Sequence, residues 1–498
     1  MRPSRLPVHR SVLSLEPLEG REVPAGLVSA LLSPLGVLTI TGDADTNGVT
    51  LKVTAADVTL TPDADTTINS AAAGVPVTLS GVVKSIKADL KGSDDTLLID
   101  NTVDFVVTGP VAIALGDGNN TLNLTTAGKI TLGALTVKGL DGTDTVTIQG
   151  GAGTGSTIGP ASFNYASGGS TTTLGDVRFN VGVNLIATDA VTVPNSVTAS
   201  NVTVIKTFSA ALGTSNPALV SFSNSTLGGL KETGYVVGAL LQSTNVLGSI
   251  NVKGGFQADL QTDTVSVSGS VALSAPAPSF TAAGDGTTIN GNLLLTGTAW
   301  TSTSFQSATL SRVKGNVTVT GGWYSDSFES NGLFRVDKNL SLTLNGGDNV
   351  VTLSDASVGG GLKIRTGAGN DQITLDRTTV ALATSIFAYA GSDSLSIENG
   401  STFATTFGAD LGTGNDTISV AQNPAASGAV TFAGAARILA GVGNDTLLLG
   451  LDPGFGGSTN SRAVFVVPTS LVDGGDGIDT FDQGTAQFTG VTPSGWNE

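Results

Sequence analysis

The chain has 498 residues, a formal net charge of -17 at pH 7 and no cysteine. The acidic balance argues against a nucleic acid or an anionic membrane as partner, since both need a cationic surface, and makes cations the more natural partners. The lack of cysteine excludes disulfides and thiolate chemistry. Glycine, at 67 residues, is nearly twice as frequent as usual, and only 13% of residues are charged, about half of the usual ~25%. With many Val, Leu, Ile, Thr and Ser, this composition favours strands joined by tight turns.

Residues 1–26 are predicted to be an export or targeting segment without stable structure. Three arginines precede position 11, but no apolar core of 7–15 residues follows, so the segment is a poor Sec signal. Residues 15–25, Leu-Glu-Pro-Leu-Glu-Gly-Arg-Glu-Val-Pro-Ala, resemble the Leu-Glu-x-Leu-Glu-x-Arg-x-x-Pro-Ala segment of planctomycete extracytoplasmic proteins. This resemblance implies export to the cell surface or beyond. The alternative is an ordinary disordered tail.

Residues 27–150 are predicted to form the first coils of a β-solenoid. Alternating apolar residues predict strands at 36–40 and 49–53. Three turns follow that end in Asp95, Asn120 and Asp144, which are 25 and 24 residues apart. Residues 151–245 keep the strand-forming composition, but their spacing is blurred, so we expect irregular coils with longer loops there.

A regular period appears in residues 246–485. A small residue followed by alternating apolar residues begins at positions 249, 270, 292, 316, 339, 361, 385 and 406, in steps of 21 to 24. The turn Gly-x-Gly-Asn-Asp occurs at 367–371, 412–416 and 441–445, and Asn349, Asp371, Asp393, Asp416 and Asp445 are separated by 22, 22, 23 and 29 residues. A fixed period of this size is typical of a solenoid, in which each coil buries its apolar face against the next.

The predicted fold is therefore all-β, a right-handed parallel β-helix with about three short strands in each coil of 22–24 residues. Alternate residues of each strand point inward, so Ile373 and Leu375 should stack in line with Ile418 and Val420. Residues 486–498 are expected to be a cap or tail that shields the last coil.

The turns resemble the haemolysin-type calcium-binding (RTX) nonapeptide Gly-Gly-x-Gly-x-Asp-x-apolar-x, most closely at residues 474–481. The motifs of this chain stand singly, one per coil, whereas that family has them in uninterrupted tandem. The resemblance implies bound Ca²⁺, with candidate ligands at Asp371, Asp393, Asp416, Asp445, Asp476 and Asp479. Stacked carboxylates repel each other, and Ca²⁺ would offset that repulsion. In the alternative interpretation each aspartate caps its own turn and faces solvent, and Asn370, Asn415 and Asn444 form a neutral amide ladder.

An enzyme of the polysaccharide lyase or hydrolase class is the rival hypothesis, because parallel β-helices also carry such activities. The best candidate is the stretch 323–329, in which Trp323 and Tyr324 could stack on a sugar and Asp326 and Glu329 could supply two carboxyl groups. An ordinary loop that covers the core explains the same residues. No nucleophile elbow, zinc-binding helix or phosphate loop is found in the sequence.

We therefore expect a secreted or cell-surface β-solenoid that is not an enzyme and has a structural or adhesive role. Many equivalent turns along a rod suit multivalent contact better than a single reaction centre. Besides calcium ions, the expected partners are extracellular polysaccharide or surface proteins. No apolar run reaches the ~18 residues of a membrane span.

Overall fold

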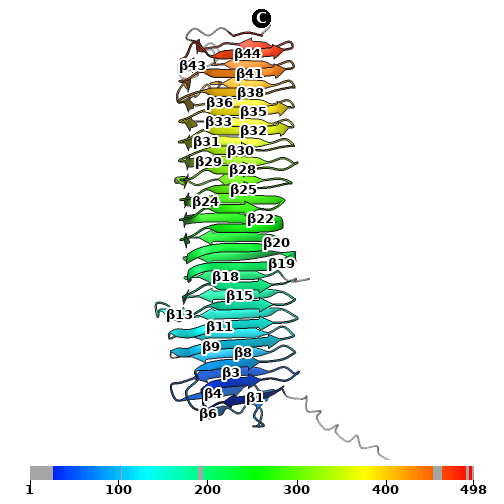
Figure 1. Ribbon diagram of the computed structural model, residues 1–498, viewed down its shortest axis with the longest axis vertical. Helices are drawn as coiled ribbons and strands as arrows, with labels where there is room; N and C mark the ends of the chain where they lie inside the picture. The colour runs from blue at the N-terminus through cyan, green and yellow to red at the C-terminus, as the bar shows by residue number, and fades with distance from the viewer. Residues whose placement is uncertain (1–25, 103, 189–193, 452–461, 489–492, 496–498) are drawn as a thin grey trace, which may run out of the picture.

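The computed structural model describes residues 26–102, 104–188, 194–451, 462–488 and 493–495. These residues form strands, turns and bends, and successive coils stack into one tall rod that rises from β1 (Gly26–Leu32) at one end to β44 (Leu471–Asp476) near the other (Figure 1). The predicted all-β parallel β-helix is confirmed. Ile373 pairs in parallel with Leu395, and Leu395 pairs with Ile418, so these two coils are 22 and 23 residues long.

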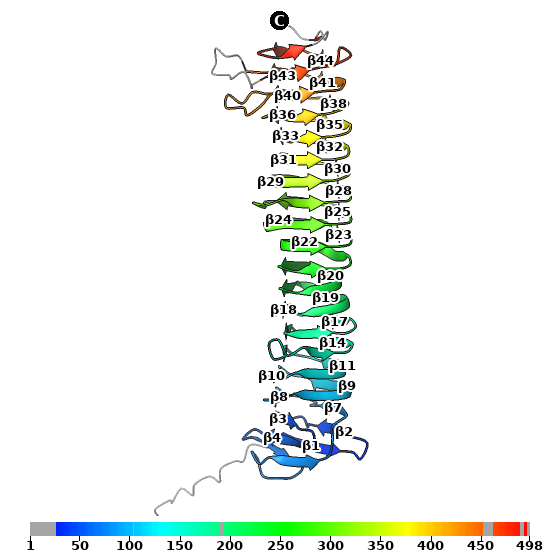
Figure 2. The same cartoon turned by 90° about the vertical axis from the view of Figure 1, so that its left-hand side faces the viewer.

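The N-terminal end of the rod differs from the coils that follow, because its strands partly pair in antiparallel fashion. It contains β1, β2 (Val37–Thr41), β3 (Gly48–Val53), β4 (Asp57–Pro62), β5 (Thr66–Ile68) and β6 (Val77–Ser80). The pairs β1–β2, β3–β4 and β4–β6 are antiparallel, whereas β2–β7 and β3–β8 start the parallel stack. Figure 2 shows this group closing the lower end of the rod, as an end cap must do to shield the first coil.

Three parallel sheets form the sides of the rod, and we call them sheets A, B and C. Sheet A continues from β2 through β7 (Ser85–Asp89), β9 (Phe105–Gly116), β11 (Ile130–Gly139), β14 (Ala161–Tyr165), β17 (Val183–Ala187), β19 (Thr203–Ser223), β20 (Thr226–Gln242), β22 (Ile250–Val267), β23 (Val271–Ser274), β25 (Leu293–Thr296), β28 (Val317–Thr320), β30 (Leu340–Thr343), β32 (Leu362–Ala368), β35 (Thr384–Ala390), β38 (Phe407–Asp410), β41 (Ala436–Val442) and β44.

Sheet B follows sheet A around the first corner of each coil. It contains β3, later segments of β19, β20 and β22, and β8 (Thr96–Asn101), β10 (Thr121–Thr126), β12 (Asp144–Gln149), β15 (Ser170–Gly175), β18 (Ser196–Ser200), β24 (Ala277–Ile289), β26 (Ser302–Phe305), β29 (Ser327–Val336), β31 (Val350–Val358), β33 (Gln372–Asp376), β36 (Ser394–Glu398), β39 (Thr417–Val420), β42 (Thr446–Leu449) and β45 (Thr480–Asp482).

Sheet C is the narrowest. It contains β13 (Ser156–Ile158), β16 (Val177–Phe179), β21 (Asn245–Val246), β27 (Ser311–Val313), β34 (Thr379–Val380), β37 (Thr402–Phe403), β40 (Val430–Phe432), β43 (Ala463–Phe465) and β46 (Gln487–Phe488), together with end segments of longer strands such as β29 and β31. Near the C-terminal end, Ser494 bridges to Asp473 of β44, so residues 493–495 lie back against the last coil.

The stretch predicted to be irregular continues the same three sheets. In sheet B, Val197 pairs with Val220, Val220 with Ala239 and Ala239 with Leu260, which gives coils of 23, 19 and 21 residues. Here β19, β20 and β22 pass around corners without a break in strand structure. The spacing is blurred in the sequence because these corners lack the Gly-Asn-Asp turn.

The core is a single column of apolar side chains inside the three sheets. Ile373 and Leu375 are buried and stack on Leu395 and Ile397, which stack in turn on Ile418 and Val420, as the alternation predicted. On sheet C, the rings of Phe403, Phe432 and Phe465 form a file with centroid distances of 5.4 and 4.8 Å. Each coil therefore buries its apolar residues only against the coils on either side.

Candidate functional site

The predicted metal ligands form a file of buried side chains at the corner between sheets A and B. We call it the inner ladder: Asp326, Asn349, Asp371, Asp393, Asp416, Asp445 and Asp479. Each side chain accepts a hydrogen bond through Oδ1 from the backbone N–H of the preceding ladder residue, one coil nearer the N-terminus. These N–H to Oδ1 distances lie between 2.7 and 2.9 Å along the whole ladder.

A second, shorter ladder lies near the N-terminal end of the same corner. The N–H of Asn47 donates to Asp95, that of Asp95 to Asn120 and that of Asn120 to Asp144, at 2.7, 2.9 and 3.3 Å. The turns that end in Asp95, Asn120 and Asp144 were recognised in the sequence, and they fold in the same way as the later ones.

Burial gives the ladder carboxyl groups unusual chemistry. The exposed fraction of Asp393 is 3% and that of Asp416 is 1%, and in the described part of the chain their Oδ2 atoms are buried without a hydrogen-bond partner. Loss of water disfavours the charged form, and burial raises the pKa of Asp393 to about 7 and that of Asp416 to about 6. The negative charges of Asp371 and Asp416 raise the pKa of Asp393 further.

The asparagine members of the ladders show what the second side-chain atom meets. Nδ2 of Asn349 donates to the carbonyl of Gly347 at 2.9 Å and to Oδ1 of Asp371 at 2.9 Å. Nδ2 of Asn120 makes the equivalent bonds to Gly118 and Asp144 at 3.1 and 3.0 Å. The corner therefore asks for an acceptor on one side-chain atom and a donor on the other, and a protonated carboxyl group supplies both.

An exposed ladder runs beside the inner one with the opposite direction of hydrogen bonding. The N–H of Ser392 donates to Oδ1 of Asn370 at 2.8 Å, and the N–H of Asn444 donates to Oδ1 of Asn415 at 2.9 Å. Asn370, Asn415 and Asn444 thus form the predicted ladder, although each accepts from a backbone amide of the next coil. The aspartates differ from the prediction that they cap their own turns in solvent, because they point inward and bind a neighbouring coil.

The predicted calcium ligands lie in two environments. Asp371, Asp393, Asp416, Asp445 and Asp479 belong to the inner ladder, whereas Asp476, the last residue of β44, is exposed. Calcium takes six to eight oxygen ligands, but Oδ1 of each ladder aspartate already binds an amide, and no group of three or more acidic or histidine side chains among the described residues could hold a metal ion. The ladder does not fit a calcium ion, and calcium binding stays a prediction to be tested.

The residues of the enzyme hypothesis do not converge on one point. Trp323 and Tyr324 are 80% and 69% exposed at the corner between sheets A and B. Asp326 points inward, where its Oδ1 accepts a hydrogen bond from Oγ1 of Thr301 at 3.0 Å, whereas Glu329 lies on the outer side of β29. The two carboxyl groups therefore lie on opposite sides of sheet B and cannot flank one glycosidic bond.

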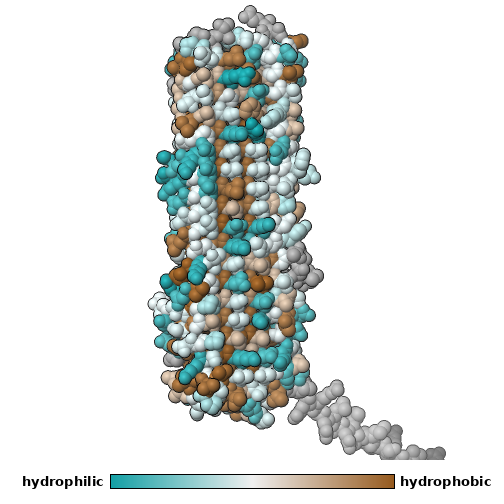
Figure 3. Space-filling view, viewed as in Figure 1, coloured by the Kyte–Doolittle hydropathy of each residue, from teal (hydrophilic) through white to brown (hydrophobic). Residues whose placement is uncertain are grey.

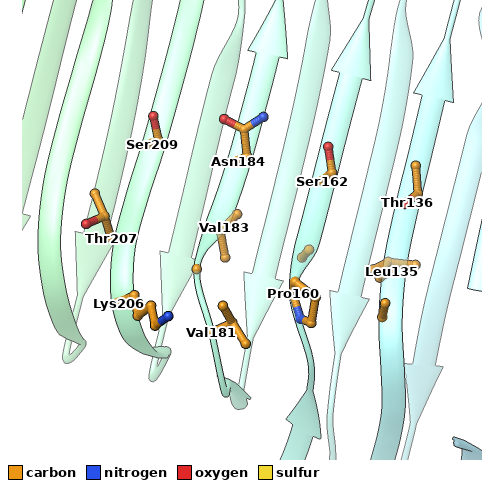
Figure 4. A pocket seen from close by; sticks show the side chains of 13 residues that line it. Leu135, Thr136, Pro160, Ser162, Val181, Val183, Asn184, Lys206, Thr207 and Ser209 are labelled. Atoms are coloured by element: carbon orange, nitrogen blue, oxygen red, sulfur yellow. The ribbon is translucent and has the colours of Figure 1, made fainter. Parts of the chain in front are cut away.

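The largest surface hollow lies on sheet A in the N-terminal half of the rod. It has a volume of about 520 Å³ and is shallow and mostly apolar (Figure 4). Lys206 is its one titratable group. Its lining residues are Ala134, Leu135, Thr136, Pro160, Ala161, Ser162, Val181, Gly182, Val183, Asn184, Lys206, Thr207 and Ser209. Such a hollow has no acid–base pair for catalysis.

A second hollow of about 380 Å³ lies farther along the same sheet, at its corner with sheet B. It is lined by Thr343, Leu344, Asn345, Arg365, Thr366, Gly367, Ala368 and Tyr389. Sequence reasoning missed Arg365 and Tyr389. A signal was present: residues 388–391 read Ala-Tyr-Ala-Gly where the preceding coil has Thr-Gly-Ala-Gly at 366–369, so a large aromatic residue stands in place of a turn glycine.

Comparison of the chain with family models, curated proteins and solved structures gives no match. In the part of the chain that the structure describes, no helix has the length and apolar character needed to cross a membrane. The export segment predicted from residues 15–25 lies outside the described residues.

Proposed function

We propose that this chain acts outside the cell as a non-enzymatic, structural and adhesive rod. The observation that supports this role most directly is the continuity of the corner hydrogen bonding. From Asp326 to Asp479 each turn is bound to the next by a buried side chain. A stack of this kind gives a long, stiff body with many equivalent surface positions, which suits display and multivalent contact.

The export part of the proposal is tested on intact cells that express the full chain. An external protease should degrade the protein before the cells are lysed, with a cytosolic protein as the control that survives. Degradation only after lysis would contradict the proposal. The non-enzymatic part is tested by incubating the purified chain with a panel of polysaccharides, where we expect neither new reducing ends nor unsaturated uronides.

Calcium is tested separately, by melting the protein in millimolar Ca²⁺ and in excess chelator. Because the Oδ1 atoms of the inner ladder are already bonded to amides, we expect the same melting temperature in both. A higher melting temperature in calcium would show that the resemblance of the turns to calcium-binding repeats extends to ion binding. The Asp476→Asn variant would then show whether the exposed carboxylate contributes.

A further inference from the structure

Tyr389 occupies a backbone position that the neighbouring coils reserve for glycine. Its φ is 81°, and the matching residues Gly367, Gly412 and Gly441 have φ values of 121°, 98° and 122°. A bulky side chain in this left-handed region is strained. The Tyr389 side chain is 50% exposed, so burial in the core does not offset the strain. Strained aromatic residues of this kind are found mainly where the side chain has a binding role.

The glycines on either side leave the Tyr389 ring open to a ligand. Gly367 pairs with Tyr389 across the sheet, and Gly412 stacks on the other side with its Cα close to the Tyr389 carbonyl. Neither has a side chain to cover the ring. The space below the ring is the hollow of about 380 Å³, which Tyr389 and Arg365 both line. Its volume lies within the ~300–1,000 Å³ that is usual for small-ligand sites.

The same part of sheet A presents unpaired cations on a strongly acidic protein. Lys363 and Arg365 lie on the outer side of β32 and Arg437 on that of β41, and none of the three belongs to an ion pair among the described residues. The Arg365 guanidinium carbon lies 5.4 Å from the centroid of the Phe387 ring, which fixes its plane. Because salt screens charges beyond ~8 Å, a ligand in the hollow is influenced more by these cations than by the net charge of the rod.

Other exposed aromatic residues lie along the same corner. Tyr389 pairs with Gly367, and the adjacent Ala368 bridges to Gly346, which stacks against the carbonyl of Trp323. Trp323 and Tyr324 therefore lie three coils below Tyr389, at a distance of about 14 Å if coils are ~4.8 Å apart. Figure 3 shows the sheet A side of the rod, where most of the surface has intermediate hydropathy and coloured patches are local. A ligand that touches both aromatic groups must be an extended chain along the rod axis.

We propose that this corner is a binding site for a carboxylated polysaccharide, with Tyr389, Trp323 and Tyr324 stacking on sugar rings and Arg365 binding a uronate carboxylate. Planar guanidinium groups bind carboxylates in bidentate fashion, and exposed aromatic rings pack on the apolar faces of sugars. Asp348 and Asp410 lie close to the site on the same corner and sheet, which disfavours more densely charged polyanions. The inference rests on the proposed adhesive function for its meaning, because it names the ligand of that function.

The test is a titration of the purified full chain with polygalacturonate, followed by calorimetry. Arg365→Gln should weaken binding about tenfold, as expected when a charge-assisted bidentate contact is lost. Tyr389→Gly should weaken binding severalfold while the melting temperature is kept or raised, since glycine relieves the left-handed strain. Lys231→Gln is the matched control: it removes an exposed cation of sheet A in β20, far from the hollow, and should leave the affinity unchanged.

Three other polymers distinguish the chemistry of the ligand. Neutral dextran lacks the carboxylates, polyglutamate lacks the sugar rings, and dextran sulfate has sulfates in their place, so all three should bind at least tenfold more weakly than polygalacturonate. Equal binding of polyglutamate would replace the proposal by one for an acidic peptide. Absence of polygalacturonate binding, or equal affinity of all three variants, would overturn it. Either result would leave the structural rod intact, because export and polysaccharide breakdown are tested by other experiments.

Discussion

The buried aspartates are the residues that most distinguish this solenoid. A carboxylate that loses its water without a full set of hydrogen bonds costs free energy, and each ladder aspartate has a bonded Oδ1 and, at Asp393, Asp416, Asp445 and Asp479, an Oδ2 without a partner among the described residues. Asparagine occupies the same position at Asn120 and Asn349 with both of its side-chain atoms bonded. The side-chain amide is therefore the better fit at neutral pH, and the carboxyl group fits best when protonated.

Substitution of Asp393 tests the part played by Oδ1. Asp393→Ala leaves the buried N–H of Asp371 without an acceptor, which should cost about 1–3 kcal/mol of folding free energy. Asp393→Asn keeps the acceptor and adds a donor, so at pH 8 it should be at least as stable as the parent. Thermal and denaturant melts followed by circular dichroism measure both. If alanine and asparagine behave alike, the hydrogen bond is not what stabilises the corner.

At the scale of the element, each coil is held by the turn between its strands of sheets A and B. The second glycine of that turn has a positive φ and lies against the coil below: a Cβ on Gly391 would come within 1.8 Å of the Gly369 carbonyl oxygen, and one on Gly414 within 1.8 Å of that of Gly391. Glycine is needed here for both the backbone conformation and the close approach of the coils.

Replacement of one turn glycine should therefore disrupt stacking locally. Gly391→Ala, at φ 139°, should cost about 1–3 kcal/mol and lower the melting temperature. Gly92→Ala is the matched control, since Gly92 is also in a turn of this corner but a Cβ there would meet nothing within 4 Å. Hydrogen exchange at the coils around residue 391 measures the local effect. Equal losses in the two variants would contradict the close-packing explanation.

The coil was predictable from the sequence because the turn and the apolar alternation share one period. The inward direction of the aspartates was also available: Asp371, Ile373 and Leu375 are alternate residues, and alternate residues lie on one side of a strand. The expected charge of Asp371 pointed to solvent instead, and only the three-dimensional structure shows the amide that it binds. The binding corner was not predictable, because the positive φ of Tyr389 is imposed by the coils that stack on it. The antiparallel pairing of β1–β2 and β3–β4 was missed since strand patterns do not encode pairing direction.

At the scale of the whole molecule, the buried carboxyl groups predict an acid-stable rod. Burial raises the pKa of Asp95 and Asp393 to about 7 and that of Asp144, Asp326 and Asp416 to about 6, from a usual value of 3.8. It also raises the pKa of Glu232, whose exposed fraction is 0%. Between pH 3.8 and 7 the folded chain then holds more protons than the unfolded chain, so their contribution to stability is complete below the lower value and is lost as the pH rises through the upper one.

We therefore expect the melting temperature to fall as the pH is raised from about 4 to about 8. Melts in a series of buffers at constant ionic strength measure this. Glu232→Gln and Asp393→Asn should each reduce the slope, because they remove a group that loses its proton in the folded state. A melting temperature that rises over this range would show that the buried carboxyl groups are charged and stabilised in the folded rod.

The most direct test of the account is disulfide trapping of the coil register, since its central claim is that equivalent residues of successive coils lie side by side. Thr374 and Ser396 are paired on the outer side of sheet B, and Ser419 is one coil farther. Cα atoms ~4.8 Å apart can form a disulfide, whereas those two coils apart, at ~9.6 Å, cannot. The chain has no cysteine of its own. Under mild oxidation the Thr374→Cys, Ser396→Cys variant should form an intrachain disulfide rapidly, and the Thr374→Cys, Ser419→Cys variant should not. Equal trapping of both pairs, or of neither, would contradict the stacked coil.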